Sequence, residues 1–215
     1  MIFTYIFVIP KNMDSKMKIS RKYIILIIVG LLVVDQVVKI LVKCNMELYQ
    51  SIHVFGNWFQ INFIENEGAA FGMKLNGDYG KLILSLFRIV AVVLIGWYVN
   101  NLFKKGAPTG VIVGISMILA GALGNIIDSA FYGLIFSEST PAAVATMFPP
   151  GGGYAGFLHG KVVDMLYFPL FTIHNMPGWL GGGSFTFFSP VFNFADSYIT
   201  VAVIYLLFFQ WRYFK

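Results

Sequence analysis

Three carboxylates at the ends of apolar segments are the residues of this chain best suited to do chemistry. Two of them close the same short pattern, Asn-x-x-Asp, which occurs at residues 125–128 and again at residues 193–196. The third, Asp164, lies between these two patterns. A charged side chain in or near a bilayer is costly, so such residues usually face a protein interior or cavity and carry function. Several carboxylates at one depth therefore indicate acid–base chemistry at a membrane interface.

The composition indicates that membrane helices position these carboxylates. Of the 215 residues, 58% are hydrophobic and 12% are charged, which is too apolar for an ordinary soluble domain. A helix needs about 20 predominantly apolar residues to cross a bilayer. Four segments qualify: 23–42, 82–103, 109–128 and 190–211. We therefore expect an all-α membrane protein with four transmembrane helices.

The distribution of lysine and arginine predicts how these helices are oriented. Most basic residues fall on the side that holds both termini and the turn near residue 104. The positive-inside rule then puts both termini in the cytoplasm and the two long connections outside. The first connection, about 44–81, contains aromatic and β-branched residues at 52–72 that suit a strand or a short sheet. The second contains Gly- and Pro-rich insertions near 134–158 and 169–189, which predict loops.

The N-terminal stretch sets the start of the domain. Residues 1–10 are apolar but too short to span a membrane, and basic residues follow them, which is the reverse of a secretory signal peptide. The native start could be Met13 or Met17. We expect a basic N-terminal leader, residues 1–21, followed by a single membrane-embedded domain, residues 22–215.

Every expected span brings a polar side chain to the outer half of the membrane. Asp35 lies about 10 Å from the outer end of the first span, at about 1.5 Å per residue. Lys39 is one turn nearer the outside on the same face. Arg88 lies at a similar depth in the second span, Asp128 ends the third, and Asp196 lies early in the fourth. This convergence favours a site at the outer leaflet.

Structural roles could account for most of these residues. Asp35 and Lys39 could neutralise each other as an ion pair that stabilises the bundle. Arg88 could extend to the lipid headgroups. Asp164, taken alone as a loop residue, would normally be solvated. Asp196 is harder to explain in this way because it lies within an apolar span.

Other kinds of chemistry have less support in the sequence. The single cysteine, Cys44, excludes an intramolecular disulfide and a cysteine metal cluster. The three histidines lack metal-ligand spacing, so we expect no metal and no cofactor. Lysine and arginine cluster between apolar runs and form no nucleic-acid-binding face, so we expect no nucleic-acid partner.

In five blocks the chain resembles the bacterial lipoprotein signal peptidases (signal peptidase II), a family of membrane aspartic proteases. The blocks are Asp35-x-x-x-Lys39, residues 65–72 (Glu-Asn-Glu-Gly-Ala-Ala-Phe-Gly), residues 121–128 (Gly-Ala-Leu-Gly-Asn-x-x-Asp), Val162-Val163-Asp164 and Phe192-Asn193-x-Ala195-Asp196. Each block alone is moderately specific at best, but their joint order on four spans is very specific. The resemblance covers roughly residues 22–211.

The resemblance implies a fold and a set of site residues. It implies a four-helix bundle with a small extracytoplasmic β-sheet cradle, long outer loops and a cleft that opens to the outer leaflet. The catalytic pair of the family corresponds to Asp164 and Asp196. The positions that bind substrate or shape the site correspond to Asp35, Lys39, Asn66, Gly68, Asn125, Asp128 and Asn193.

The resemblance also implies a substrate and a location. The substrate would be a prolipoprotein that carries a diacylglyceryl group on its lipobox cysteine. Cleavage would fall immediately before that cysteine and release the signal peptide. The enzyme would lie in the bacterial cytoplasmic (inner) membrane, in contact with membrane lipids, and we expect a monomer.

Two features depart from the family pattern. The family usually has an arginine after the third-span aspartate, Asp128, whereas this chain has Ser129. A donor to substrate carbonyls then has to come from elsewhere, and Lys161 and Arg88 are the candidates. The separations between the aspartates are also longer than in the family. Loop length costs little entropy, roughly 0.6 kcal/mol per doubling, so the aspartates can still meet, and the insertions could form a lid or a docking surface.

Two functions from other classes stay open on the residues alone. A small transporter could relay protons or bind cations at Asp35, Asp128 and Asp196. The inner halves of the four spans are nearly devoid of polar residues, which leaves no path through the membrane. A non-enzymatic membrane scaffold could use the Asn-x-x-Asp patterns to join helices. The scaffold predicts that Asp→Asn changes are nearly silent, whereas the protease predicts loss of cleavage.

Overall fold

The computed structural model describes most of the chain. The described residues are 19–67, 78–175, 177–180 and 182–215. The expected basic leader, residues 1–21, therefore lies almost entirely outside the described residues. Gly68, one of the expected site residues, also lies outside the described residues.

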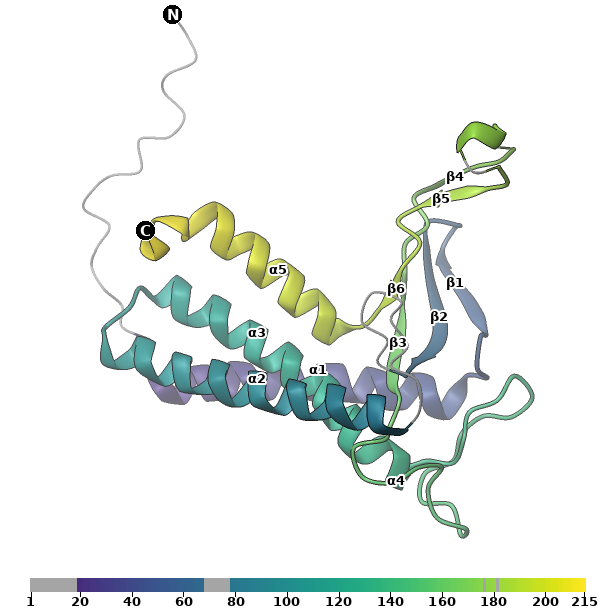
Figure 1. Cartoon of the computed structure of the whole chain (residues 1–215), viewed down its shortest axis with the longest axis horizontal. Helices are drawn as coiled ribbons and strands as arrows, with labels where there is room; N and C mark the ends of the chain where they lie inside the picture. Colours follow the sequence, from purple (N-terminus) through teal and green to yellow (C-terminus); the bar gives the residue numbers. More distant parts are fainter. Residues whose placement is uncertain (1–18, 68–77, 176, 181) are drawn as a thin grey trace, which may run out of the picture.

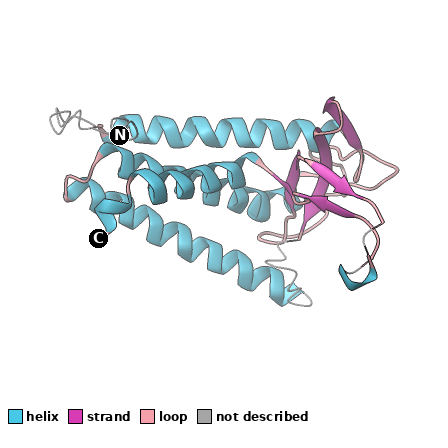
Figure 2. Ribbon diagram, turned by 90° about the horizontal axis from the view of Figure 1, so that it is seen from above, coloured by secondary structure: helices cyan, strands magenta, loops and turns pink. Residues whose placement is uncertain are grey.

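Long apolar helices form the body of the molecule (Figures 1 and 2). They are α1 (Arg21–Asn45), α2 (Asp78–Lys104), α3 (Thr109–Ile127) and α5 (Phe194–Phe209). The central helix is α3, because it contacts α1, α2 and α5. After α3 the chain continues without a break into a π-helical turn, η1 (Asp128–Tyr132), and a short α4 (Gly133–Ile135). Asp128 is the first residue of the π-helical turn, a feature that often marks functional sites.

Three of the described helices are long and apolar enough to cross a membrane. They span Arg21–Asn45, Gly80–Lys104 and Thr109–Ile135. The fourth apolar segment differs from the expected span 190–211, because its helix α5 has only 16 residues and begins at Phe194. The residues before it form a short strand, β6 (Val191–Phe192), which pairs with another strand. A run of apolar residues alone does not distinguish a buried strand from the start of a helix.

Small residues on α3 allow its neighbours to approach closely. A side chain at Gly124 would lie 2.7 Å from the carboxylate oxygen of Asp35 on α1 and 3.1 Å from Ala195 on α5. A side chain at Gly114 would lie 2.7 Å from Leu206 on α5. Small residues at such positions let helix backbones pack closely in membranes. Gly124 thus brings α1 and α5 together next to the acidic side chains.

The outward faces of the helices expose large apolar side chains. Phe87 and Trp97 on α2 are 69% and 64% exposed, and Phe208 on α5 is 73% exposed. A soluble protein rarely exposes so large a continuous apolar surface to water. Lipid chains accept it without cost, so the molecule is a multi-pass membrane protein.

A four-stranded antiparallel sheet lies across one end of the helices (Figure 2). In space its strands follow the order β1 (Ser51–Phe55), β2 (Phe59–Asn66), β3 (Val162–Tyr167) and β6. The strand content expected within residues 52–72 is thus confirmed as the β1–β2 hairpin. A buried cluster that includes Val42 on α1, Phe63 on β2, Tyr132 on η1 and Val163 on β3 joins this sheet to the helices.

The expectation that Asp164 lies in a loop was wrong. Asp164 is on the central strand β3, opposite Ile64 of β2, and is only 5% exposed. Five of the six β3 residues are buried, so this strand has no alternation of polar and apolar residues by which to recognise it. Its partner strand β2 lies about a hundred residues earlier in the chain, and local sequence carries no sign of such a distant pairing.

The two expected insertions take different forms. The first, near 134–158, packs back on the body, where Phe136 is 1% exposed and Ser139 is 2% exposed. The second, near 169–189, contains a two-stranded hairpin, β4 (Phe171–Ile173) and β5 (Phe185–Phe187), with a 3-10 turn, η2 (Gly178–Leu180). This hairpin extends away from the helices (Figure 1). Another 3-10 turn, η3 (Trp211–Phe214), follows α5.

Candidate active site

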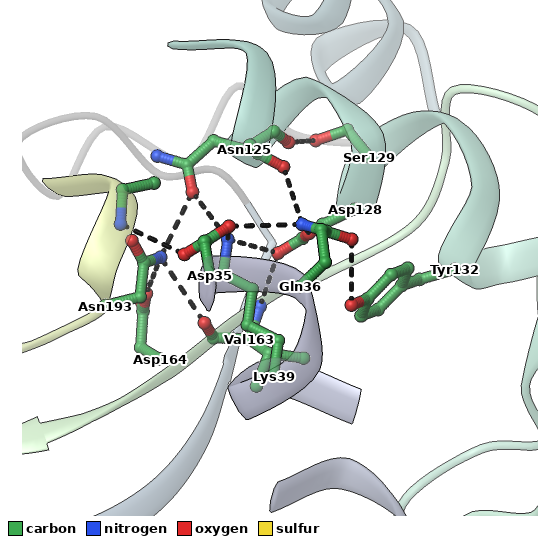
Figure 3. A network of polar contacts seen from close by, with 12 residues as sticks. Asp35, Gln36, Lys39, Asn125, Asp128, Ser129, Tyr132, Val163, Asp164 and Asn193 are labelled. Atoms are coloured by element: carbon green, nitrogen blue, oxygen red, sulfur yellow. Dashed lines mark hydrogen bonds and ion pairs between the residues drawn. The ribbon is translucent and has the colours of Figure 1, made fainter. Parts of the chain in front are cut away.

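Polar side chains from four parts of the fold meet where the helices reach the sheet (Figure 3). They come from α1, from the end of α3 with η1, from β3 and from the residue before α5. The residues labelled in Figure 3 are Asp35, Gln36, Lys39, Asn125, Asp128, Ser129, Tyr132, Val163, Asp164 and Asn193. These elements are separated by dozens of residues in the chain, so only the folded protein assembles the site.

Lys39 lies at the centre of a buried charge cluster. Its Nζ is 2.9 Å from Oδ2 of Asp35 and 2.9 Å from Oδ2 of Asp128, and it donates a hydrogen bond of 3.1 Å to Oδ1 of Asn125. The side chains of Lys39, Asp35 and Asp128 are at most 1% exposed. Buried charges need such pairing to offset their desolvation. The expected pair of Asp35 and Lys39 is present, and it extends to α3.

Gln36 is a member of this cluster that the sequence reasoning missed. Its Nε2 donates to Oδ1 of Asp128 at 2.9 Å and to Oδ2 of Asp35 at 3.1 Å. Its Oε1 accepts a hydrogen bond of 3.1 Å from the hydroxyl of Tyr132. The signal that could have found it is an uncharged polar residue next to Asp35 within an apolar helix.

The two carboxylates bound to Lys39 hold the backbone beside Asp164 and Asp196. Oδ2 of Asp128 accepts a hydrogen bond of 3.2 Å from the backbone N–H of Val163, which precedes Asp164 on β3. Oδ1 of Asp35 accepts one of 3.0 Å from the backbone N–H of Ala195, which precedes Asp196 on α5. Lys39 is therefore linked through Asp35 and Asp128 to the two chain segments that carry Asp164 and Asp196.

The two Asn-x-x-Asp patterns have different structural roles. At residues 193–196 the pattern is a capping box at the start of α5. Oδ1 of Asn193 accepts from the backbone N–H of Asp196 at 2.9 Å, and the backbone N–H of Asn193 donates to Oδ2 of Asp196 at 3.4 Å. At residues 125–128 the same pattern lies at the end of α3, and the side chains of Asn125 and Asp128 both contact Lys39. Asp196 consequently lies in the first turn of α5, because this helix begins at Phe194 and not at the expected residue 190.

Asp164 is buried and hydrogen-bonded by two asparagines. Nδ2 of Asn193 donates to its Oδ1 at 2.7 Å, and Nδ2 of Asn66 on β2 donates to its Oδ2 at 3.3 Å. Burial, and then the nearby negative charge of Asp196, raise the pKa of Asp164 to about 7, although both hydrogen bonds act in the opposite direction. Asp164 can therefore hold a proton near neutral pH.

Two asparagines connect Asp196 to Asp164. Nδ2 of Asn125 donates to Oδ1 of Asp196 at 2.9 Å, and Oδ1 of the same amide accepts from Nδ2 of Asn193 at 3.1 Å. Asn193 in turn contacts both aspartates. Asp196 is half-buried, and so it is more open than Asp164. The result is a pair of carboxylates held by shared amide groups.

The two candidate donors, Arg88 and Lys161, have different positions. Nη1 of Arg88 on α2 donates to Oγ of Ser129 at 3.1 Å, beside the acidic residues. Nζ of Lys161 lies 3.5 Å from a carboxylate oxygen of Glu65 and 3.5 Å from one of Glu138, so its ion pairs are with these glutamates. Of the two, Arg88 is the cation that reaches the site.

This geometry can support acid–base chemistry on a bond held between two carboxylates. Among the described residues, no group of three or more His, Cys, Asp or Glu side chains is arranged to hold a metal ion. The site combines a carboxyl group with a pKa near neutrality, a second carboxylate beside it, and a rigid supporting network. The fold and the site thus define a membrane protein that holds two neighbouring carboxyl groups, Asp164 and Asp196, in one polar network.

Comparison with known proteins gives the family. The family model described as "Signal peptidase (SPase) II" matches residues 27–212, so this chain belongs to the signal peptidase II family, a family of proteases. A lipoprotein signal peptidase of Porphyromonas gingivalis is 52% identical over 190 residues, which cover 86% of this chain and 81% of that protein. A lipoprotein signal peptidase of Amoebophilus asiaticus is 36% identical over 176 residues, which cover 80% of this chain and 70% of that protein.

Solved structures agree with this family assignment at the level of the fold. One described as a bacterial membrane enzyme matches with a TM-score of 0.59 and 25% sequence identity, over 89% of this chain and 89% of that one. The match extends over the helices and the sheet rather than over one element.

Proposed function

We propose that this protein is an aspartic endopeptidase that removes the signal peptide from diacylglyceryl-modified prolipoproteins, by cleavage just before the lipidated cysteine. Membership of the signal peptidase II family supports the substrate class and the reaction. The aspartic type rests on the geometry of two carboxyl groups and on the pKa of one of them. Asp164 and Asp196 are bridged by Asn125 and Asn193, and the pKa of Asp164 is near neutrality.

Peptide hydrolysis by two aspartates needs one of them protonated and the other ionised. Two carboxylates that share a site repel each other, so the pair holds a single proton over a range of pH. Asp164, the more buried of the two, is the more readily protonated, because burial disfavours its charged form. In the free enzyme Asp164 carries the proton and Asp196 is the base.

The reaction then proceeds in two proton-balanced steps. Asp196 takes a proton from a water molecule as the water oxygen attacks the scissile carbonyl carbon. Asp164 donates a hydrogen bond to the carbonyl oxygen, where negative charge develops. In the second step the C–N bond breaks, and a proton from the pair goes to the leaving amine. The carboxyl product leaves with the water oxygen, and no cofactor takes part.

The remaining expected site residues position this pair. Asn66, Asn125 and Asn193 orient the two carboxyl groups through the hydrogen bonds described above. Asp35 and Asp128, which both pair with Lys39, hold the backbone next to each catalytic aspartate. Gly68 is proposed to shape the site on the basis of the family pattern, because it lies outside the described residues.

The location of the site supports a substrate that is held in the membrane. We assign α5 as the fourth membrane span, the four-stranded sheet as an extracytoplasmic cradle, and the aspartate pair to the outer leaflet of the bacterial cytoplasmic membrane. Both termini are then cytoplasmic, and residues 22–215 act as one domain and as a monomer. In this position the pair has access both to water and to a lipid-anchored peptide, whose acyl chains can stay in the bilayer.

A cleavage assay tests the proposal. The purified protein in detergent is given a diacylglyceryl-modified prolipoprotein, and the product is followed by gel shift. Wild type should cleave, whereas Asp164→Asn and Asp196→Asn should not. Glu138→Gln is the matched control, because it removes a carboxylate that is 63% exposed and lies outside the site. Full activity of either aspartate variant would refute the assignment and mean that the chemistry lies elsewhere. Failure of wild type to cleave would refute the protease and revive the scaffold interpretation.

A further inference from the structure

The guanidinium of Arg88 lies beside the aspartates but is not neutralised by any of them. It is half-buried on α2, and the charges of Asp196, Asp128 and Asp164 all act on it. Within the described ranges, no carboxylate lies close enough to form an ion pair with it, and Oγ of Ser129 is its one hydrogen-bond acceptor. Such an arginine is unusual, because a partly buried cation next to three carboxylates normally pairs with one of them.

Ser129 fixes the position of this guanidinium. Ser129 is 3% exposed, and its hydroxyl donates a hydrogen bond of 3.0 Å to the backbone carbonyl of Asn125. The same oxygen accepts from Nη1 of Arg88 at 3.1 Å. One turn earlier on α2, the hydroxyl of Ser85 donates to the backbone carbonyl of Leu158 at 2.9 Å. These contacts hold α2 against the start of η1 and against the segment that leads into β3.

The chemistry of a guanidinium points to what it binds. Arginine has five N–H donors in a planar fork, and Ser129 takes one of them. The remaining donors suit oxygen acceptors, and they lie near the carboxyl pair that is proposed to act on the substrate. A diacylglyceryl peptide offers carbonyl oxygens of two kinds, in its peptide bonds and in the esters of its acyl chains.

We propose that Arg88 is a substrate-binding residue that donates hydrogen bonds to a carbonyl oxygen of the bound lipopeptide, close to the scissile bond. This inference rests on the proposed function, since it takes its substrate from there. Arg88 reaches the site from α2 and contacts Ser129, the residue at which this chain departs from the arginine usual in the family. The cation is thus supplied by a different helix.

Kinetic comparison of variants tests this inference. Arg88→Met should raise KM for the lipopeptide roughly 10-fold or more, because a hydrogen bond from a charged donor is lost. Arg88→Lys keeps a charged donor, so its KM should lie between those of wild type and Arg88→Met. Lys104→Met is the matched control, because it removes one exposed positive charge from the other end of the same helix and should keep the wild-type KM. An unchanged KM in Arg88→Met overturns the inference.

A structural role for Arg88 predicts a different pattern. If the residue only fastens α2 to η1, Ser129→Ala should be as damaging as Arg88→Met, because both remove the same contact. If it binds substrate, Ser129→Ala should be clearly milder, since the guanidinium is still present. The double variant Arg88→Met with Ser129→Arg, which supplies the guanidinium from η1, should lower KM toward that of wild type. Equal damage without rescue overturns the binding role.

Two further experiments identify the carbonyl that Arg88 binds and separate binding from turnover. A substrate with ether-linked chains lacks the ester carbonyls. Arg88→Met should impair this substrate as strongly as the ester form if the acceptor is a peptide carbonyl, and not at all if it is an ester carbonyl. An equilibrium binding measurement in the Asp164→Asn background reports on Arg88 without turnover. If wild type fails to cleave, the proposed function falls, and this binding measurement still decides whether Arg88 binds the lipopeptide.

Discussion

Replacement of Lys39 by methionine tests how the buried charge cluster supports the aspartate pair. Methionine has nearly the length of lysine and is apolar, so the change removes the ammonium group and little else. Lys39 is the cation that pairs with both Asp35 and Asp128, at 2.9 Å each, and all three side chains are buried. The change therefore leaves two carboxylates in the interior without their counter-ion.

The expected loss of stability follows from this geometry. Breaking a buried ion pair by removing one partner costs about 3–5 kcal/mol. Uptake of a proton by one of the freed carboxylates relieves part of this cost, so we expect the lower end of the range. For a chain of this size, about 2–4 °C of Tm per kcal/mol gives a decrease of roughly 6–12 °C. Thermal unfolding in detergent measures it.

The activity of the protein that is still folded should fall as well. Asp128 and Asp35 accept hydrogen bonds from the backbone N–H groups of Val163 and Ala195, which adjoin the two proposed catalytic aspartates. A proton on either carboxylate weakens that contact and loosens the spacing of the pair. We expect at least a 10-fold loss of cleavage rate per folded enzyme, because one loosened hydrogen bond of about 1.4 kcal/mol corresponds to that factor.

Lys43→Met is the matched control for this experiment. Lys43 is also fully buried on α1, one turn beyond Lys39, but it pairs with Glu65 and donates to Oγ of Ser139 at 2.8 Å. Its loss should lower Tm in a similar way but reduce the rate per folded enzyme far less, because its partner Glu65 is connected to Asp164 only through the neighbouring Asn66. The reasoning is refuted if Lys39→Met keeps the wild-type Tm and rate, or if Lys43→Met reduces the rate per folded enzyme as strongly.

The remaining predictions concern the carboxylates themselves. Asp164→Asn and Asp196→Asn should insert and fold but leave uncleaved, lipidated precursor in cells, as seen on gels; normal processing would contradict the assignment. Asp128→Asn should lower both Tm and activity, because it loses part of its pairing with Lys39, and wild-type values of both would make it a bystander. The cleavage rate should fall as the pH rises above about 7, because Asp164 then loses the proton that it donates. Its raised pKa also means that folding stability decreases as the pH rises toward 7, a slope that Asp164→Asn should remove; a flat pH profile of rate and stability would contradict this role.

The insertion near 134–158 is attached to the site more firmly than a lid would be. Ser139 donates to a carboxylate oxygen of Glu65 at 2.9 Å, and Lys43 binds that same oxygen. Glu65 adjoins Asn66, which contacts Asp164. The insertion therefore packs against the strand that supplies one of the site's asparagines, and this arrangement favours a supporting role over the lid or docking role.

Much of this protein can be read from local sequence. Long apolar runs predicted the positions of three spanning helices to within a few residues, because the spacing of apolar side chains along a helix is a local property. The pairing of Asp35 with Lys39 follows from the i,i+4 geometry of one helix. The two Asn-x-x-Asp patterns were recognisable as polar residues in apolar surroundings, whereas Asp164 was singled out by its place between them and by the family resemblance.

Only the tertiary structure decided how these residues act together. It put Asp164 on a buried strand, turned one Asn-x-x-Asp pattern into a helix cap, and linked Arg88 to Ser129. Each of these contacts, apart from the cap, joins residues that are dozens of positions apart in the chain. Local propensity does not encode such contacts, because they depend on how helices and strands pack once small residues on α3 let them approach.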